Sequence, residues 1–161
     1  MTDPLSFIVR KIALHKRASR KQTAILPLSE VRKATVYVDN FDYDADPTRQ
    51  CVKNTFDALN IPVKIICPQK WDINIFGLLK PERPLDGKIP EKWDEDLFIC
   101  MANDDSFAPE YASRCSTATF KVGRRQLKGD VFDLVLKDPI DKIPLQHNVF
   151  LSIMELLKKI Q

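Results

Sequence analysis

Short apolar runs alternate with amphipathic segments along the chain, and this alternation predicts its elements. Runs rich in β-branched and other apolar residues predict strands at 35–39, 61–67, 97–102, 118–122 and 131–136. Apolar residues spaced three or four positions apart predict helices at 48–59, 106–113 and 145–160. Strands that alternate with helices favour a mostly parallel sheet. We therefore expect an α/β fold, a three-layer sandwich of about five strands with helices on both faces.

The strand predicted at 118–122 ends in a basic turn. Its apolar positions alternate with polar ones, which is typical of a strand with one apolar face. Gly123 follows, and we expect it to turn the chain with a positive φ, which glycine accepts without steric cost. Lys121, Arg124 and Arg125 gather at this turn, so it is a place to look for a ligand.

An amphipathic helix is predicted near the N-terminus. Asp3 is a suitable N-cap, and Pro4 is tolerated in a first turn. Leu5, Ile8 and Ile12 then fall on one apolar stripe at helical spacing. The cations of the helix lie mostly off this stripe: Arg10, Lys11, Lys16 and Arg17. Such a helix docks on its own domain, lies on an anionic membrane or nucleic acid, or binds a protein partner; all three stay open.

Net charge is unevenly distributed along the chain. Residues 1–33 contain eight Lys or Arg and two acidic residues, a net charge of +6, so the remainder carries −3 of the total of +3. We therefore divide the chain into a basic helical arm, residues 1–33, and a single α/β domain, residues 34–161. No apolar run approaches the roughly 20 residues of a transmembrane segment, and no secretory pattern is visible. These features predict a cytoplasmic protein.

The segment 69–96 lacks clear periodicity and contains both tryptophans. Residues 72–76 alternate and are compatible with a short strand, and we expect the rest to be loop. A connection this long and irregular is either a functional lid or a local elaboration of the fold. We favour elaboration.

Common catalytic and nucleotide-binding motifs are missing from the sequence. The four glycines form neither a GxGxxG loop nor a P-loop, and no GxSxG or HExxH motif occurs. None of the four cysteines forms a CxxC pair, so we expect buried free thiols and no metal site. The sequence therefore predicts no cofactor and no catalytic residue.

Acidic and amide residues follow two of the predicted strands, at the ends where α/β folds place ligands. If those strands are parallel and adjacent, one sheet edge gathers six candidate ligand-binding residues. They are Asp39, Asp42, Asn103, Asp104, Lys121 and Arg124. Such a set either holds magnesium and phosphate or forms surface ion pairs of small worth, about 0–1 kcal/mol each. The simpler interpretation is that these side chains cap the backbone of ordinary turns and form surface ion pairs.

Three segments resemble a known family. They are the basic N-terminal helix, the strand that ends in Asp39, and the stretch Ser116-x-Ala118-x-Phe120-Lys121-Val122-Gly123 followed by Phe132-Asp133-Leu134. Over nearly the whole chain, they resemble an uncharacterised domain-of-unknown-function family of Bacteroidetes proteins. The resemblance implies an α/β sandwich and brings no known activity, cofactor or catalytic residue. The acidic run Asn103-Asp104-Asp105 departs from the family pattern and weakens the case for a shared acidic site.

The leading hypothesis is a non-catalytic cytoplasmic binding or accessory domain whose basic arm contacts a protein or an anionic partner. Its predicted contact residues are Arg10, Lys11, Lys16 and Arg17. A homodimer through the helix is one form of this contact, and membrane-surface or nucleic-acid contact ranks lower.

The alternative hypothesis is an enzyme or ligand-binding domain for a nucleotide or another phosphorylated small molecule. Asp39 and Asp104 would then hold a metal ion or act as bases. Lys121 and Arg124 would bind the phosphate.

Overall fold

The computed structural model describes residues 3–81, 93–137 and 144–161, and within these ranges the chain forms five strands, four α-helices and two 3-10 helices. The strands are β1 (Ala34–Tyr37), β2 (Val63–Ile66), β3 (Leu97–Cys100), β4 (Phe120–Gly123) and β5 (Leu134–Val135). The α-helices are α1 (Pro4–Arg17), α2 (Ala45–Ala58), α3 (Phe107–Cys115) and α4 (Gln146–Lys158). Two short 3-10 helices complete the set, η1 (Leu28–Glu30) and η2 (Lys70–Asp72).

The five strands form one parallel sheet in the order β2-β1-β3-β4-β5, which confirms the predicted α/β fold. Ala34 at the start of β1 lies opposite Val63 on one side and Leu97 on the other, so the central strands begin in register. The strand order reverses direction between β1 and β3. In open α/β sheets, ligands bind at such a switch point, beyond the carboxyl ends of the strands.

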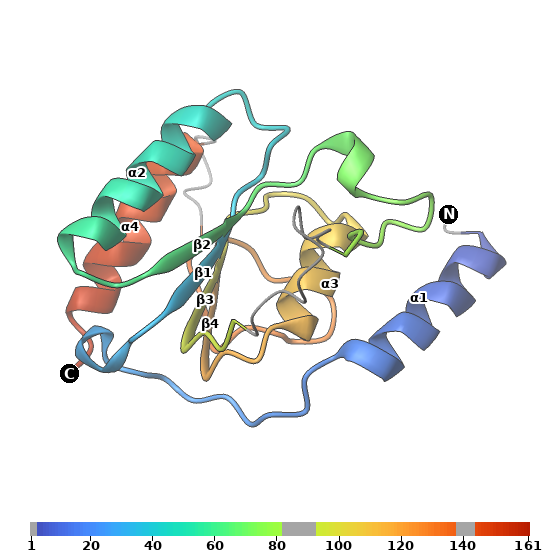
Figure 1. Cartoon of the computed structure of the whole chain (residues 1–161), viewed down its shortest axis with the longest axis horizontal. Coiled ribbons are helices and arrows are strands. Elements are labelled where there is room, and N and C mark those ends of the chain that lie inside the picture. Colours follow the sequence, from blue (N-terminus) through green and yellow to red (C-terminus); the bar gives the residue numbers. More distant parts are fainter. Residues whose placement is uncertain (1–2, 82–92, 138–143) are drawn as a thin grey trace, which may run out of the picture.

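Helices cover both faces of the sheet (Figure 1). On one face α2 and α4 pack side by side, and the rings of Phe56 and Phe150 meet with centroids 6.2 Å apart. On the other face α3 lies against the sheet, and α1 lies outside α3, at the edge of the molecule (Figure 1). Val36 and Ile99 point to the α2–α4 side, whereas Tyr37 belongs to the cluster on the α3 side, as strand alternation requires.

Two predicted strands are shorter than expected or missing. The segment 131–136 supplies only the two residues of β5. Residues 72–76 do not form a strand, because η2 ends at Asp72 and only a single antiparallel bridge joins Ile73 to Leu79. Part of the predicted elaboration, residues 82–92, lies outside the described ranges.

Gly123 is required for a reason different from the predicted one. Its φ does not lie in the left-handed region, so the expected positive-φ turn at this residue is wrong. Gly123 is instead the last residue of β4 and pairs with Val135 of β5. A Cβ atom on Gly123 would lie 2.3 Å from Cδ2 of Phe132, so the aromatic ring occupies the space that any other side chain needs.

The basic N-terminal segment packs on the rest of the chain. Asp3 caps α1, since its carboxylate accepts hydrogen bonds from the backbone N–H groups of Leu5 and Ser6. Beyond α1, the N–H of Ser19 donates to the carbonyl of Arg114 at 2.8 Å. This second hydrogen bond holds the chain that follows α1 against α3, and α1 itself contacts α3.

Candidate functional site

The carboxyl end of β1 is clamped to the start of α4. The Asp39 N–H donates to Oε1 of Gln146 at 2.8 Å, and Nε2 of Gln146 donates to the Asp39 carbonyl at 3.0 Å. Gln146 is fully buried, and the Asp39 carboxylate accepts a hydrogen bond from the N–H of Phe41. Burial raises the pKa of Asp39, and the charges of Asp42 and Asp104 raise it further.

Arg124 extends from the end of β4 toward the loop after β1. Its guanidinium is buried, with Nη1 3.4 Å from Oδ2 of Asp42 and Nη2 donating to the carbonyl of Pro144 at 3.0 Å. The guanidinium therefore ties three loops of the sheet edge together. An incoming phosphate would have to compete with Asp42 for it.

The loop after β3 is held in a similar way. Nη1 of Arg125 donates to the carbonyl of Asn103 at 2.9 Å, and Nη2 lies 3.3 Å from Oδ2 of Asp105. The Asp104 carboxylate accepts hydrogen bonds from both the N–H and the hydroxyl of Ser106, just before α3. These are local turn contacts of the kind that acidic residues make at the start of a helix.

Lys121 does not join the other five candidates. It lies in the interior of β4, and its side chain points toward α3, where its ammonium donates to the carbonyl of Ser113 at 2.8 Å. Burial lowers the pKa of Lys121, partly offset by the negative charges of Asp133 and Glu95. The ammonium is therefore a buried contact between the sheet and α3.

The strand ends thus bring Asp39, Asp42, Asn103, Asp104 and Arg124 to one edge of the sheet. A hollow of about 420 Å³ lies beside them, lined by Asn103, Arg124, Arg125 and residues of β5 and its following loop. Within the described ranges, no three His, Cys, Asp or Glu residues are placed to hold a metal ion. Three cations line this hollow: Arg124 and Arg125 are engaged by carboxylates and carbonyls, and Lys137 is exposed.

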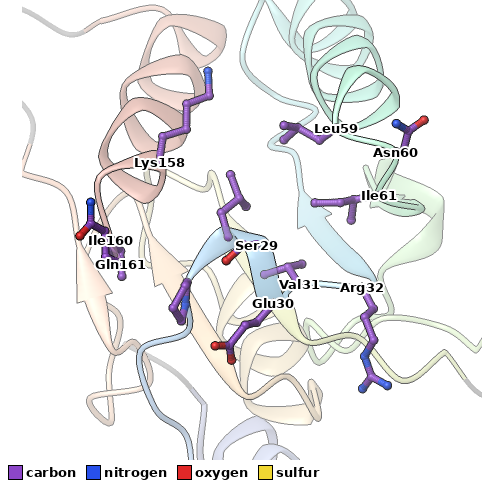
Figure 2. Close-up of a pocket in the computed structure, with 12 residues that line it drawn as sticks. Ser29, Glu30, Val31, Arg32, Leu59, Asn60, Ile61, Lys158, Ile160 and Gln161 are labelled. Atoms are coloured by element: carbon purple, nitrogen blue, oxygen red, sulfur yellow. The ribbon is translucent and has the colours of Figure 1, made fainter.

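A larger hollow of about 890 Å³ lies at the opposite end of the sheet, where the strands begin (Figure 2). Leu59 and Ile61 after α2, Val31 before β1 and Ile160 after α4 contribute to its lining. In Figure 2 the Arg32 guanidinium points away from this group, and it pairs with Asp96. The lining is mixed, because six of its twelve residues are apolar and six are polar or charged. The hollow lies far from the residues that the sequence singled out.

The surface of α1 divides into two faces of different character. Arg10 and Arg17 face inward: Nε of Arg10 donates to the carbonyl of Phe76 at 2.7 Å, and Nη1 of Arg17 lies 3.5 Å from the Tyr111 hydroxyl. The Arg10 guanidinium also lies 4.7 Å from the ring centroid of Phe107. Two of the four predicted contact cations are therefore used to dock the helix.

The outer face of α1 consists of Leu5, Ile8, Lys11, Ile12, His15 and Lys16, all of them exposed. Leu5, Ile8 and Ile12 are 59%, 53% and 50% exposed, so the predicted apolar stripe is not the surface by which α1 docks. No acidic residue occurs between Pro4 and Arg17. The outer face is thus an apolar stripe with cations on its flanks. In the described part of the chain, no helix is long and apolar enough to cross a membrane.

Three residues at the sheet edge were missed from the sequence: Asp44, Gln146 and His147. The Asp44 carboxylate accepts hydrogen bonds from the backbone N–H of His147 at 3.1 Å and lies 2.9 Å from its Nδ1. Asp44 therefore joins the start of α2 to the first turn of α4. The only signal in the sequence was that polar residues, Gln146 and His147, stand at the start of the predicted C-terminal helix. That signal did not identify Asp39 and Asp44 as their partners.

These features define an open, parallel α/β domain with strand order 2-1-3-4-5 and a basic amphipathic helix outside α3. Residues 10–157 match a family of unknown function, DUF6913, and the chain belongs to this family. This confirms the resemblance to a domain of unknown function. No curated protein and no solved structure matches the chain.

Proposed function

We propose that this protein is a non-catalytic binding domain that contacts an anionic partner through the outer face of α1. The observation that carries the proposal is the exposure of Leu5, Ile8 and Ile12 beside Lys11 and Lys16 on a helix whose other face is docked. Exposed apolar side chains that form a continuous patch mark interaction sites more often than isolated ones do. The cations give that patch a preference for negative charge.

The alternative, a phosphate site at the strand ends, has less support. Arg124 and Arg125 are engaged by Asp42, Asp105 and backbone carbonyls, and Lys121 points into the α3 interface. A guanidinium that already has a carboxylate partner gains less from a phosphate, because the existing contact must first be broken.

A photo-crosslinking experiment in living cells tests the proposal. A benzophenone amino acid replaces Ile8 on the outer face, and the matched control replaces Leu151, an apolar residue of α4 that is 43% exposed. We expect illumination to attach a partner at position 8 and not at position 151. The double charge reversal Lys11→Glu/Lys16→Glu should reduce the yield at position 8.

Lys11 and Lys16 are exposed, and Lys16 lies in the last turn of α1. The two substitutions together should therefore lower stability by only about 1 kcal/mol, which a thermal melt verifies. Equal crosslinking at positions 8 and 151, or a yield at position 8 that ignores the charge reversal, would refute the proposal.

A further inference from the structure

We infer that the anionic partner is a lipid surface, on which α1 lies in the plane of the membrane with its outer face toward the bilayer. This inference rests on the proposed function and names its partner. Interfacial helices combine an apolar stripe that enters the headgroup region with cations that attract anionic lipids. The outer face of α1 has both components on one side of one helix.

The apolar component is available without any rearrangement. Leu5, Ile8 and Ile12 each expose half or more of their surface, and Phe7 on the adjoining side is 61% exposed. The hydrogen bond of Arg10 to Phe76 anchors α1 from the inner face. An isolated helix of this length is marginal in water, whereas this one is already formed before it meets a membrane.

The charge on α1 argues against a second copy of the chain as the occupant. Two outer faces packed together would bring the Lys11 and Lys16 cations of both copies into one interface, where each copy offers only the Asp3 carboxylate at the start of α1 to compensate. Like charges in close contact oppose association. An anionic surface instead pairs with every cation of the face at once.

The position of the apolar stripe argues against nucleic acid. Nucleic-acid backbones are bound by cations, and single strands also by stacked aromatic rings, but the middle of the outer face presents Leu5, Ile8 and Ile12. Those side chains would lie against phosphates and gain nothing. Against a bilayer the same side chains leave water, while Lys11 and Lys16 reach the headgroups beside them. Arg20 and Lys21, exposed in the chain that follows α1, extend the basic character of the arm.

Vesicle flotation with the full chain tests the inference. The probe is a set of extruded vesicles of 30% phosphatidylglycerol in phosphatidylcholine, with pure phosphatidylcholine vesicles as the comparison. We expect the protein to float with the anionic vesicles at low salt, and to float much less with the neutral ones. Binding should weaken as salt is added, because the attraction of exposed charges is screened.

Two variants separate the contributions of charge and apolar surface. Lys11→Glu/Lys16→Glu removes two cations, each worth about fivefold in binding at an anionic membrane, so we expect a loss of about 25-fold or more. Ile8→Ser/Ile12→Ser keeps every charge but removes two half-exposed side chains, and we expect a loss of about fivefold for each. The matched controls are Lys53→Glu/Lys159→Glu, with the same charge change on exposed residues away from α1, and Leu151→Ser on α4. Both controls should bind more tightly than the corresponding α1 variants.

The outcomes distinguish this inference from the proposal beneath it. If anionic vesicles do not bind the protein while position 8 still crosslinks to a protein, the lipid inference fails and the proposed contact through α1 stands. If neither vesicle binding nor a crosslink at position 8 is seen, both the lipid inference and the proposed function fail. Binding that depends on Lys11 and Lys16 but ignores Ile8→Ser/Ile12→Ser would overturn the seating of the apolar stripe in the membrane.

Discussion

Gly123 at the end of β4 tests how tightly this part of the sheet is packed. A Cβ atom there would lie 2.3 Å from Cδ2 and 2.5 Å from Cε2 of Phe132, whereas carbon atoms in contact normally stay about 3.5–4.0 Å apart. Relief is restricted, because Gly123 is paired with Val135 in the sheet and Phe132 is only 8% exposed. We expect Gly123→Ala to lower the free energy of unfolding by about 1–3 kcal/mol, the usual range for overpacking.

The assay is urea unfolding followed by circular dichroism, performed in two backgrounds. Phe132→Ala alone should cost about 3–5 kcal/mol, because it removes a buried ring. In that background the added methyl group of Gly123→Ala has room. The same substitution should then cost nothing or stabilise by up to about 1 kcal/mol, since alanine restricts the unfolded chain. Phe132→Leu provides a milder background if Phe132→Ala fails to fold.

The difference between the two backgrounds is the coupling energy between Gly123 and Phe132. A coupling near zero would refute the argument, because the cost of Gly123→Ala would then arise from something other than the aromatic ring. A neutral Gly123→Ala in the wild-type background would refute it as well.

Three further predictions concern the sheet edge and the thiols. Asp44→Asn should lower the unfolding free energy by about 1–2 kcal/mol at pH 7. Burial opposes ionisation of Asp44, but hydrogen bonds from His147 outweigh this effect and lower the pKa of Asp44. The stabilisation by the Asp44 carboxylate is therefore present above the ordinary pKa of 3.8 and is lost as the pH falls through the lowered pKa. Urea titrations from pH 7 down to about pH 2 measure it, and a wild-type advantage that does not decrease as the pH falls below 3.8 would contradict it. Gln146→Ala should cost about 1–3 kcal/mol in the same assay, because it leaves the buried N–H and C=O of Asp39 without Gln146 as partner, and a neutral substitution would rule out the clamp. Burial raises the pKa of Cys100 to about 12. Iodoacetamide at pH 8 should therefore label Cys100 more slowly than the half-buried Cys51, Cys67 and Cys115. Mass spectrometry of native samples measures the labelling, and labelling of Cys100 as fast as that of the other three thiols would contradict the prediction.

Most of the sheet could be predicted from the sequence because its signal is local. The runs that became β1, β2 and β3 are short and mostly apolar, as a parallel sheet with helices on both faces requires. The segment that became β4 alternates between apolar and polar residues, which also predicts a strand. The length of β5 was overestimated, because the apolar run over 131–136 extends beyond the two residues that pair with β4. A local apolar run indicates that a strand can form and does not indicate how many of its residues find a neighbouring strand.

The candidate site was predicted only in part. Asp39 and Asn103 do lie at one edge, because parallel strands end on the same side of a sheet. Lys121 was grouped with them by its position next to the turn, yet its place in β4 directs its side chain to the α3 face. Gln146 was missed because its partner, Asp39, lies 107 residues away.

The basic N-terminal arm shows most clearly which properties the sequence determines and which depend on the tertiary structure. The sequence by itself determined that α1 is a capped, basic helix with Leu5, Ile8 and Ile12 on one stripe, because helical spacing and capping depend on residues within one or two turns. Only the tertiary structure decided that the stripe faces outward. That choice depends on contacts such as Arg10 with the carbonyl of Phe76, 66 residues away, and no local pattern in the sequence encodes a partner at that distance.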